Sequence, residues 1–295
     1  MKYVIFPNLT KPAAHRTALA VCEKLRGLSG EIIMDEALRQ QFDAVGYIRF
    51  LPEDTVLQDA DFVIAIGGDG TILRYARMIL RDAAAHHKTP VPLVGINTGT
   101  LGFLAAFESD ELDMLERLET GDYTRSERML LQAELPDSAG IQTDVGCIAL
   151  NDIYASRMNG KICDFSVAVD GQQIGVFRAD GIIFSTPTGS SAYALSAGGP
   201  VMEPDLALIE MNLICPHSLF ARPMLFAPTR SIRVTYRGAG NGGLRVHTDG
   251  AETAILRNTQ SFTVRRADHS IPFITCKGQT FYDVLSGKLM RPLKA

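Results

Sequence analysis

The sequence DFVIAIGGDGT, residues 61–71, decides the fold class of this chain. Residues 61–66 are nearly all apolar, which is typical of a short strand with both faces covered. A glycine-rich turn follows at 67–71, and residues 71–85 have the spacing of a helix. Strand, turn and helix in this order indicate an α/β domain with a parallel sheet, and they place the turn at the carboxyl end of a strand.

The flanking sequence repeats this alternation. Residues 3–6 predict a first strand and 13–25 a helix, 91–96 predict another buried strand, and 110–120 predict an acidic helix that ends at Gly121. Residues 36–60 are polar and irregular and predict no element. We therefore expect an α/β nucleotide-binding domain over residues 1–128.

The pattern changes near Arg128 to short strands separated by turn residues. Such strands are predicted at 130–134, 165–169, 182–185, 231–236, 244–248 and 261–265. A mainly β, substrate-binding domain over 129–270 follows. The tail returns to a strand at 272–275 and a helix at 281–289, and we expect 271–295 to pack back on the first domain.

Composition excludes several classes of protein. The 295 residues are 46% hydrophobic and 21% charged, as in a folded globular protein, and the net charge of −4 argues against a general nucleic-acid binder. The five cysteines are scattered without a CxxC pair, which favours free thiols in a reducing compartment. No apolar run reaches the length of a membrane span, and the short one at the N-terminus is closed by Pro7, unlike a signal peptide. We expect a cytoplasmic protein without a membrane partner.

The turn at 67–71 suits a polyanion. Glycines let the backbone approach a phosphate closely, and the N-terminus of the next helix offers unpaired N–H groups. A lone aspartate in such a turn is usually a turn former or a helix cap. Alternatively, Asp69 holds Mg²⁺ or accepts a proton from an attacking hydroxyl, because a carboxylate in a phosphate-binding loop otherwise repels its ligand.

Three further polar segments follow apolar runs. Residues 180–200, DGIIFSTPTGSSAYALSAGGP, are rich in hydroxyls that suit ribose and phosphate, with Tyr193 able to stack on a base; the alternative is an ordinary surface loop. Residues 95–103, GINTGTLGF, follow the strand at 91–96. Asn151-Asp152, taken alone, is more often an ordinary turn.

Two nucleotide-binding signatures are missing or misleading. The sequence GxxxxGK[ST] does not occur, which excludes an ordinary P-loop kinase. GAGNGG at 238–243 fits GxGxxG, but it joins two predicted strands instead of opening a helix, and we interpret it as a hairpin loop. The six histidines have no metal-ligand spacing.

The motifs together resemble the bacterial NAD kinases over almost the whole chain. GGDG alone also occurs in diacylglycerol-type lipid kinases and phosphofructokinases, whereas the combination of GINTGTLGFL (95–104) with RADGIIFSTPTGSSAYALSAGGP (178–200) is specific. In order, they are GGDGT (67–71), GINTGTLGFL (95–104), ERML (127–130), LND (150–152), RADGIIFSTPTGSSAYALSAGGP (178–200) and ICPHSLFARP (214–223).

The resemblance implies the two-domain NAD kinase fold and an enzyme that transfers the γ-phosphoryl group of ATP to the 2′-hydroxyl of the adenosine ribose of NAD, giving NADP and ADP. It implies Mg²⁺, bound with ATP near Asp69 rather than by a fixed set of protein ligands, and a homodimer or homotetramer. Two alternatives stay open: a non-catalytic NADP-binding sensor, and a lipid kinase that shares the GGDG turn.

The resemblance also implies residue roles. Asp69 matches the proton acceptor, Asp152 replaces a glutamate that contacts NAD, and Asp180 matches a residue that acts across a subunit interface. Ser191 replaces the usual threonine, and Ala251 replaces a glutamine that often follows Asp-Gly. The full set of expected substrate- and cofactor-binding residues is Gly68, Gly70, Arg74, Asn97, Asn151, Asp152, Arg178, Asp180, Ser191, Ala192, Tyr193 and Ser196.

Overall fold

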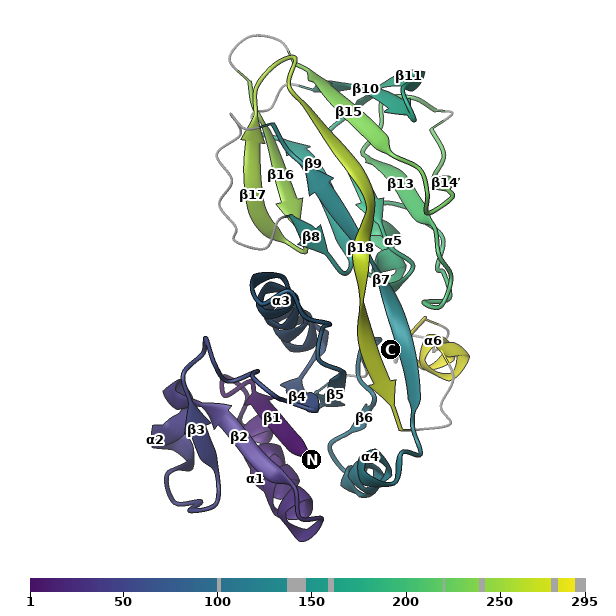
Figure 1. The fold of residues 1–295 in the computed structure, drawn as a ribbon. Coiled ribbons are helices and arrows are strands. Elements are labelled where there is room, and N and C mark those ends of the chain that lie inside the picture. The colour runs from purple at the N-terminus through teal and green to yellow at the C-terminus, as the bar shows by residue number, and fades with distance from the viewer. Residues whose placement is uncertain are drawn as a thin grey trace. The chain divides into compact units, whose positions relative to one another are not determined.

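A computed structural model describes residues 1–99, 102–136, 147–158, 162–219, 221–238, 242–276 and 281–289 (Figure 1). The chain forms two compact units. The first consists of Met1–Glu127 and the segment that begins at Ile271, and the second of Arg128–Ser270. The two long strands β7 (Thr124–Glu134) and β18 (Ser261–Thr275) each run through a boundary between units.

The first unit is built on parallel strands in the order β5-β4-β1-β2-β3, with β6 parallel beside β5. The predicted parallel α/β architecture is therefore confirmed. The elements are β1 (Lys2–Pro7), α1 (Pro12–Gly27), β2 (Glu31–Asp35), the 3₁₀ turn η1 (Glu36–Leu38), α2 (Arg39–Phe42), β3 (Arg49–Leu51), β4 (Phe62–Gly67), α3 (Asp69–Ala85), β5 (Leu93–Asn97), β6 (Phe107–Glu108), η2 (Leu112–Leu115), α4 (Glu116–Thr120) and α6 (Phe281–Leu289).

Helices cover both faces of this sheet, as Figure 1 shows for α1 and α3 on opposite sides of β1 and β4. Ile5 and Ile64 belong to the core that α1 shares. On the other face Phe6 stacks on Tyr75 of α3, with ring centroids 4.4 Å apart. All six residues of β4 are buried, which explains why its sequence is an apolar run without alternation.

Two predictions in this unit were incomplete. The region 36–60, which predicted no element, contains η1, α2 and β3, each only three or four residues long and therefore without a measurable period. The acidic segment 110–120 forms η2 and then α4 instead of one helix, although it ends as predicted at Gly121, a left-handed cap with φ of 74°.

The second unit is mainly antiparallel, as predicted. One sheet has the order β14-β13-β12-β9-β16-β17, and β11-β10-β15-β18 form another antiparallel set, with an apolar core shared by both. The elements are β8 (Ile148–Ala149), β9 (Asp152–Arg157), β10 (Cys163–Val169), β11 (Gln172–Ala179), β12 (Gly181–Ser185), the 3₁₀ turn η3 (Thr188–Ser191), α5 (Tyr193–Ser196), β13 (Ile209–Ile214), β14 (Met224–Phe226), β15 (Ile232–Arg237), β16 (Leu244–Thr248) and β17 (Ala251–Leu256).

Two interpretations were wrong here. The strands predicted at 261–265 and 272–275 are one continuous strand, β18, because the exposed polar residues in its middle break the apolar pattern without breaking the backbone. The strands on either side of the GxGxxG segment at 238–243 are not the two strands of a hairpin, since β15 pairs with β10 and β18 whereas β16 pairs with β9 and β17. Residues 239–241 themselves lie outside the described part of the chain.

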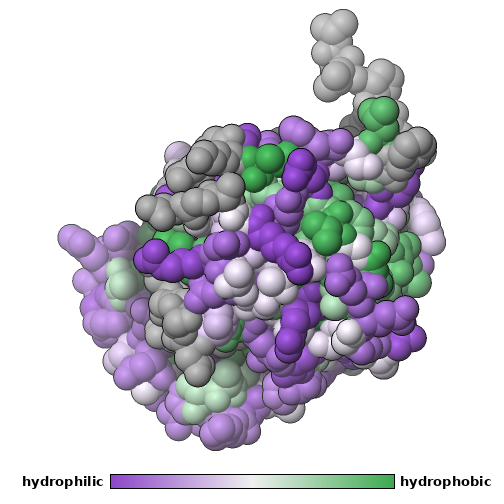
Figure 2. Space-filling model, turned by 90° about the horizontal axis from the view of Figure 1, so that it is seen from above, coloured by the Kyte–Doolittle hydropathy of each residue, from purple (hydrophilic) through white to green (hydrophobic). Residues whose placement is uncertain are grey.

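The surface is mixed in character. Figure 2 shows a face on which hydrophilic residues predominate, with hydrophobic groups between them. Ile174 and Val176 on β11 and Leu225 on β14 are exposed apolar side chains on edge strands of the second unit. The cysteines are free thiols, as predicted, and only Cys215 is exposed. None of the described helices is both long and apolar enough to cross a membrane.

Candidate functional site

The glycine-rich turn joins the end of β4 to the start of α3. Gly67 is the last residue of β4, and a Cβ there would lie only 2.6 Å from Cβ of Thr71. Gly68 is the N-cap of α3 and has no side chain with which to cap it. The first-turn amides of a 17-residue helix therefore meet no side-chain acceptor from the cap, as an anion-binding helix terminus requires.

Asp69, the first residue of α3, ties the turn to the second motif. Its Oδ2 accepts a hydrogen bond from the backbone N–H of Phe103 at 2.9 Å, and its Oδ1 accepts one from Leu104 at 3.1 Å. Gly102 allows this approach, because a Cβ there would overlap Oδ1. The carboxylate thus orients the 102–104 segment and is oriented by it, a link that sequence reasoning missed. Thr100 and Leu101 of the same motif lie outside the described residues.

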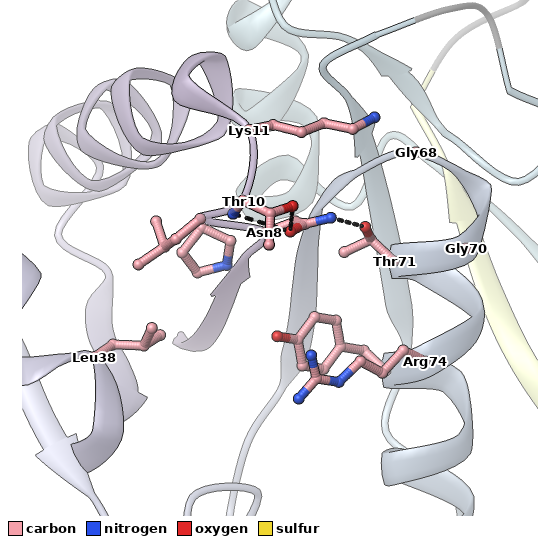
Figure 3. Close-up of a pocket in the computed structure, with 11 residues that line it drawn as sticks. Asn8, Thr10, Lys11, Leu38, Gly68, Gly70, Thr71 and Arg74 are labelled. Atoms are coloured by element: carbon pink, nitrogen blue, oxygen red, sulfur yellow. Dashed lines mark hydrogen bonds between the residues drawn. The ribbon is translucent and has the colours of Figure 1, made fainter.

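A pocket of about 510 Å³ opens beside the turn (Figure 3). Across it, Asn8 donates from Nδ2 to Thr71 Oγ1 at 2.9 Å, and its Oδ1 accepts from Thr10 Oγ1 at 2.7 Å. Asn8 therefore holds the β1–α1 loop against the first turn of α3. The lining residues are Pro7, Asn8, Leu9, Thr10, Lys11, Leu38, Gly68, Gly70, Thr71, Arg74 and Tyr75.

Two cations flank this pocket. Figure 3 shows Lys11 and Arg74 on opposite sides of the Asn8–Thr71 pair. Lys11 Nζ lies 3.5 Å from where a Cβ would stand on Gly68 and 3.2 Å from the corresponding position on Gly99. Within the described part of the chain neither cation forms an ion pair, so both charges are available to an anion. Sequence reasoning included Arg74 but missed Lys11, although its place just after β1 puts it at the same sheet edge as the glycine turn.

Asn97 has a different environment from the one expected of a ligand contact. Its side chain is fully buried at the end of β5. Its Nδ2 donates to Glu108 Oε2 at 2.7 Å and to Gly99 O at 3.3 Å, and its Oδ1 accepts from Gly99 N. The side chain fixes the turn after β5, and its contact with a substrate stays a prediction.

In the second unit Asp249 organises the segment that contains Asn151 and Asp152. Its carboxylate accepts from the N–H groups of Leu150 at 2.9 Å, Asn151 at 2.8 Å and Asp152 at 3.2 Å. The Asp152 side chain is only 4% exposed. Burial, and secondarily the charge of Asp249, raises the pKa of Asp152 to about 7. This carboxyl group consequently changes protonation state near neutral pH.

The hydroxyls of the loop after β12 divide into two groups. The buried ones build the loop: Thr186 Oγ1 donates to Leu150 O at 2.6 Å and accepts from Gly189 N at 3.0 Å, and Ser190 Oγ accepts from Met202 N at 2.9 Å. The predicted binding residues lie further along and retain accessible surface. They are Ser191, Ala192, Tyr193 and Ser196.

Tyr193 belongs to an aromatic cluster. Its ring meets Tyr154 edge-on at 5.1 Å, and Tyr154 stacks on His247 at 4.4 Å with 8° between the planes. The Tyr193 side chain is 39% exposed, so one part of it can contact a ligand while the rest is supported from below. Tyr154 and His247 were not predicted, because nothing in the sequence indicates that their strands are neighbours.

Arg178, an expected substrate-binding residue, forms an ion pair within the second unit. Its guanidinium forms two hydrogen bonds with Asp164, Nε to Oδ1 at 2.7 Å and Nη2 to Oδ2 at 2.9 Å. The two residues face each other across β10 and β11. Asp180 is also paired, with Arg157 Nη2 at 3.0 Å. Both predicted substrate contacts are thus members of ion pairs within the second unit.

The described residues contain no group of three or more His, Cys, Asp or Glu side chains that could hold a metal ion.

Comparison with known proteins covers both units. The family model for the ATP-NAD kinase N-terminal domain matches residues 4–123, and the model for the ATP-NAD kinase C-terminal domain matches 150–276. The NAD kinase of Chlorobaculum tepidum is 30% identical over 98% of this chain and 97% of its own length. That of Symbiobacterium thermophilum is 33% identical over 98% of each.

Two solved structures have a similar fold. The yeast NADH kinase complexed with NADH shares the fold, with a TM-score of 0.85 at 22% identity, covering 98% of this chain and 87% of that one. An NAD kinase from Archaeoglobus fulgidus in complex with ATP has a TM-score of 0.72 at 26% identity, covering 98% and 99%.

Proposed function

This chain belongs to the NAD kinase family, and from that membership we propose that it transfers the γ-phosphoryl group of ATP to the 2′-hydroxyl of the adenosine ribose of NAD, giving NADP and ADP. The observation that carries the proposal is the glycine turn, at a helix terminus without a side-chain cap, beside a pocket flanked by two cations. None of the relatives reported above is a lipid kinase or a sensor.

The phosphate chain of ATP occupies the pocket beside the glycine turn. Lys11 and Arg74 neutralise part of its charge, while the first-turn amides of α3 donate to its oxygens. Gly68 and Gly70 leave the backbone accessible for this contact. In this assignment Asn8 acts indirectly, by holding the loop that presents Lys11.

Asp69 is the residue that acts on the attacking hydroxyl. Its carboxylate is held by two backbone N–H groups, so it is oriented before a substrate arrives. It accepts the proton of the ribose 2′-hydroxyl as the phosphoryl group transfers. Because the transition state of phosphoryl transfer is loose, holding the hydroxyl in line contributes more than removing its proton early.

Mg²⁺ is part of the proposal. Bound chiefly by the phosphates of ATP, it would supply neutralisation of the charge that develops during transfer. Asp69, the first residue of α3 after the glycine turn, is the residue that would supply a carboxylate oxygen to the ion.

The NAD-binding residues lie in the second unit. Tyr193 offers an exposed ring to a base, and Ser191 and Ser196 offer hydroxyls to the ribose. Asn151 and Asp152 follow as polar contacts, and a protonated Asp152 can donate a hydrogen bond. The other residues proposed to bind NAD in this unit are Ala192, Arg178 and Asp180.

We also propose a homodimer or homotetramer in the cytoplasm, with Asp180 acting at the NAD site of a neighbouring subunit. The exposed apolar side chains of Ile174 and Val176 on an edge strand support an interface between copies. Free cysteines support a reducing compartment.

A coupled assay of NADP formation tests the function. The purified protein is supplied with NAD and, in separate reactions, ATP, GTP or polyphosphate. NADP should form with ATP and Mg²⁺ and not with NAD alone. Failure with every donor, together with retained binding of NADP, would contradict an enzyme and support the sensor alternative.

A further inference from the structure

Strand β13 carries a buried polar pair that the proposed mechanism does not use. Ile209, Met211 and Leu213 point into the apolar core of the second unit, so Glu210 and Asn212 point to the opposite face of the sheet. Neither is open to solvent: Glu210 is 0% exposed and Asn212 is 2% exposed. A carboxyl group in such a place is uncommon unless something uses it.

The pair lies directly beneath the backbone of residues 194–199. Asn212 Nδ2 donates to Glu210 Oε1 at 2.6 Å and also lies 3.4 Å from the carbonyl oxygen of Ala194. Gly199 N–H donates to the same carbonyl at 3.0 Å. A Cβ on Gly199 would overlap both Glu210 Oε1 and Asn212 Nδ2, so only glycine allows the backbone to rest on the pair.

A purely structural support would not need these groups. Glu210 Oε2 and Asn212 Oδ1 are buried and find no hydrogen-bond partner among the described residues. Each such atom loses its hydrogen bonds with water and gains none in return, whereas apolar side chains of similar size would pack without that loss. The polar pair therefore does something that an apolar filler cannot, and the atoms it contacts belong to the loop.

We propose that Glu210 and Asn212 are positioning residues for the adenosine-binding segment of the second unit. They fix the backbone at Ala194 and Gly199, and thereby set the placement of Tyr193 and Ser196. The inference rests on the proposed function, because NAD binding is assigned to this segment.

Protonation of Glu210 couples this support to pH. Burial raises the pKa of Glu210 to about 7, against the lowering effect of the Asn212 hydrogen bond. Burial and the Asn212 hydrogen bond are the causes that act on the pKa of Glu210. On the strands beside it, β14 places Leu225 opposite Glu210, and β9 places Asp152 beyond Ser185 of β12. The other titratable groups on neighbouring elements are Tyr193 on α5 and Glu203 and Asp205 in the 197–208 loop. Above pH 7 an unsolvated charge lies under Gly199, and the loop is held less firmly.

Two variants test the proposal. Glu210→Gln keeps the shape and an acceptor but cannot ionise. Asn212→Leu removes the donor to Ala194. Thr235→Val breaks a partly buried hydrogen bond with Ser261 on other strands of the same unit, and it controls for a general loss of stability.

The expected kinetic result is a change confined to NAD. Asn212→Leu should raise KM for NAD about three- to tenfold, the range for one lost hydrogen bond, with kcat and KM for ATP within about twofold. For the wild type KM for NAD should rise between pH 6.5 and 8.5, and for Glu210→Gln the rise should be smaller. Because Asp152 titrates in both proteins, only the difference between their two profiles counts.

Amide hydrogen exchange of the ligand-free protein gives a second measurement that needs no activity. Peptides covering residues 194–200 should exchange at least about fivefold faster in Asn212→Leu, and not in Thr235→Val. Equal exchange in Asn212→Leu and wild type, or superimposable pH profiles for wild type and Glu210→Gln, would overturn the proposal. Absence of NADP formation in the wild type would instead contradict the function and leave the exchange result to decide the positioning role.

Discussion

Replacing Asp69 with asparagine tests both roles that the structure gives this residue. The carboxylate accepts one backbone N–H on each oxygen, from Phe103 and Leu104. Asparagine has one oxygen and one NH₂ group, so it can satisfy only one of these two donors and turns an N–H group toward the other. The substitution therefore disturbs the 102–104 segment as well as removing a base.

The two effects have different magnitudes. Loss of one hydrogen bond to a charged acceptor, with the freed N–H facing another donor, should lower the free energy of unfolding by about 1.5–3 kcal/mol. Loss of a positioned proton acceptor should lower kcat by about 10²–10⁴. If Asp69 had only the structural role, the variant would be less stable, but its folded molecules would turn over at a nearly normal rate, because another group would then accept the proton.

Urea unfolding and kcat at saturating NAD and ATP separate these effects. We expect both to change, with KM for NAD nearly constant. Gly102→Ala is the matched control, since its Cβ would overlap Asp69 Oδ1 and displace the same contact while leaving the carboxylate in place. A kcat for Asp69→Asn above half of the wild-type value, or a smaller loss of kcat than Gly102→Ala causes, would refute the proton-acceptor role.

Three further predictions concern charge. Lys11→Ala should raise KM for ATP about tenfold or more and leave KM for NAD unchanged. Arg16→Ala removes an exposed cation outside the pocket and should change neither KM; an equal effect of the two variants on KM for ATP would refute the assignment of the pocket to ATP. Arg178→Gly should change the ratio of kcat/KM for NAD to kcat/KM for NADH by less than about twofold, because Asp164 already neutralises the guanidinium. A tenfold decrease in this ratio would contradict that reasoning and show that Arg178 distinguishes the two dinucleotides. Because the pKa of Glu210 is raised in the folded protein, its protonated carboxyl group stabilises the fold fully below the unfolded pKa, and this stabilisation is lost as the pH rises to about 7. Urea unfolding of the wild type should therefore show that the free energy of unfolding falls by about 3 kcal/mol between pH 4.5 and 7, and Glu210→Gln should lack this fall. Parallel plots of the free energy of unfolding against pH for the two proteins would contradict the prediction.

The sequence predicted those parts of the fold that depend on local pattern. β4 was found because both of its faces are covered, and the left-handed end of α4 was found because glycine favours that conformation. The interruption of β18 was predicted wrongly, since exposed polar residues within a strand resemble a loop when its partners are unknown. The pattern of apolar residues in a sequence shows which side chains are buried, but it does not show whether a strand continues through its exposed residues.

The site was predictable in its motifs and not in its contacts. Asp69 was identified by its turn, but its bonds to Phe103 and Leu104 depend on how β5 and the following loop lie beside α3. Asp164 escaped notice as the partner of Arg178 because their pairing depends on the register of two strands. Lys11 was missed for a similar reason, since only the order of parallel strands brings the end of β1 next to the end of β4.

The same limit applies to the hydroxyl-rich loop, where the structure separates residues that the sequence presents as equivalent. Thr186 is buried and both donates to Leu150 O and accepts from Gly189 N, whereas Ser191 is partly exposed and its Oγ has only a 3.5 Å contact with Thr188 O. Thr186→Val should leave a carbonyl and an N–H unsatisfied and lower the free energy of unfolding by about 2–4 kcal/mol.

Ser191→Ala removes a hydroxyl whose one contact within the loop, to Thr188 O, is long at 3.5 Å. It should raise KM for NAD severalfold while the free energy of unfolding changes by less than about 0.5 kcal/mol. Urea unfolding and steady-state kinetics on both variants measure the contrast. If Ser191→Ala destabilises the protein as much as Thr186→Val does, the two hydroxyls have the same structural role, and the division between loop-building and NAD-binding residues is wrong. If instead only Thr186→Val loses stability, the accessible hydroxyls are the ones that remain for the ribose. The Thr186 hydroxyl has already used its one donor inside the loop, and burial keeps its remaining lone pair away from a ligand.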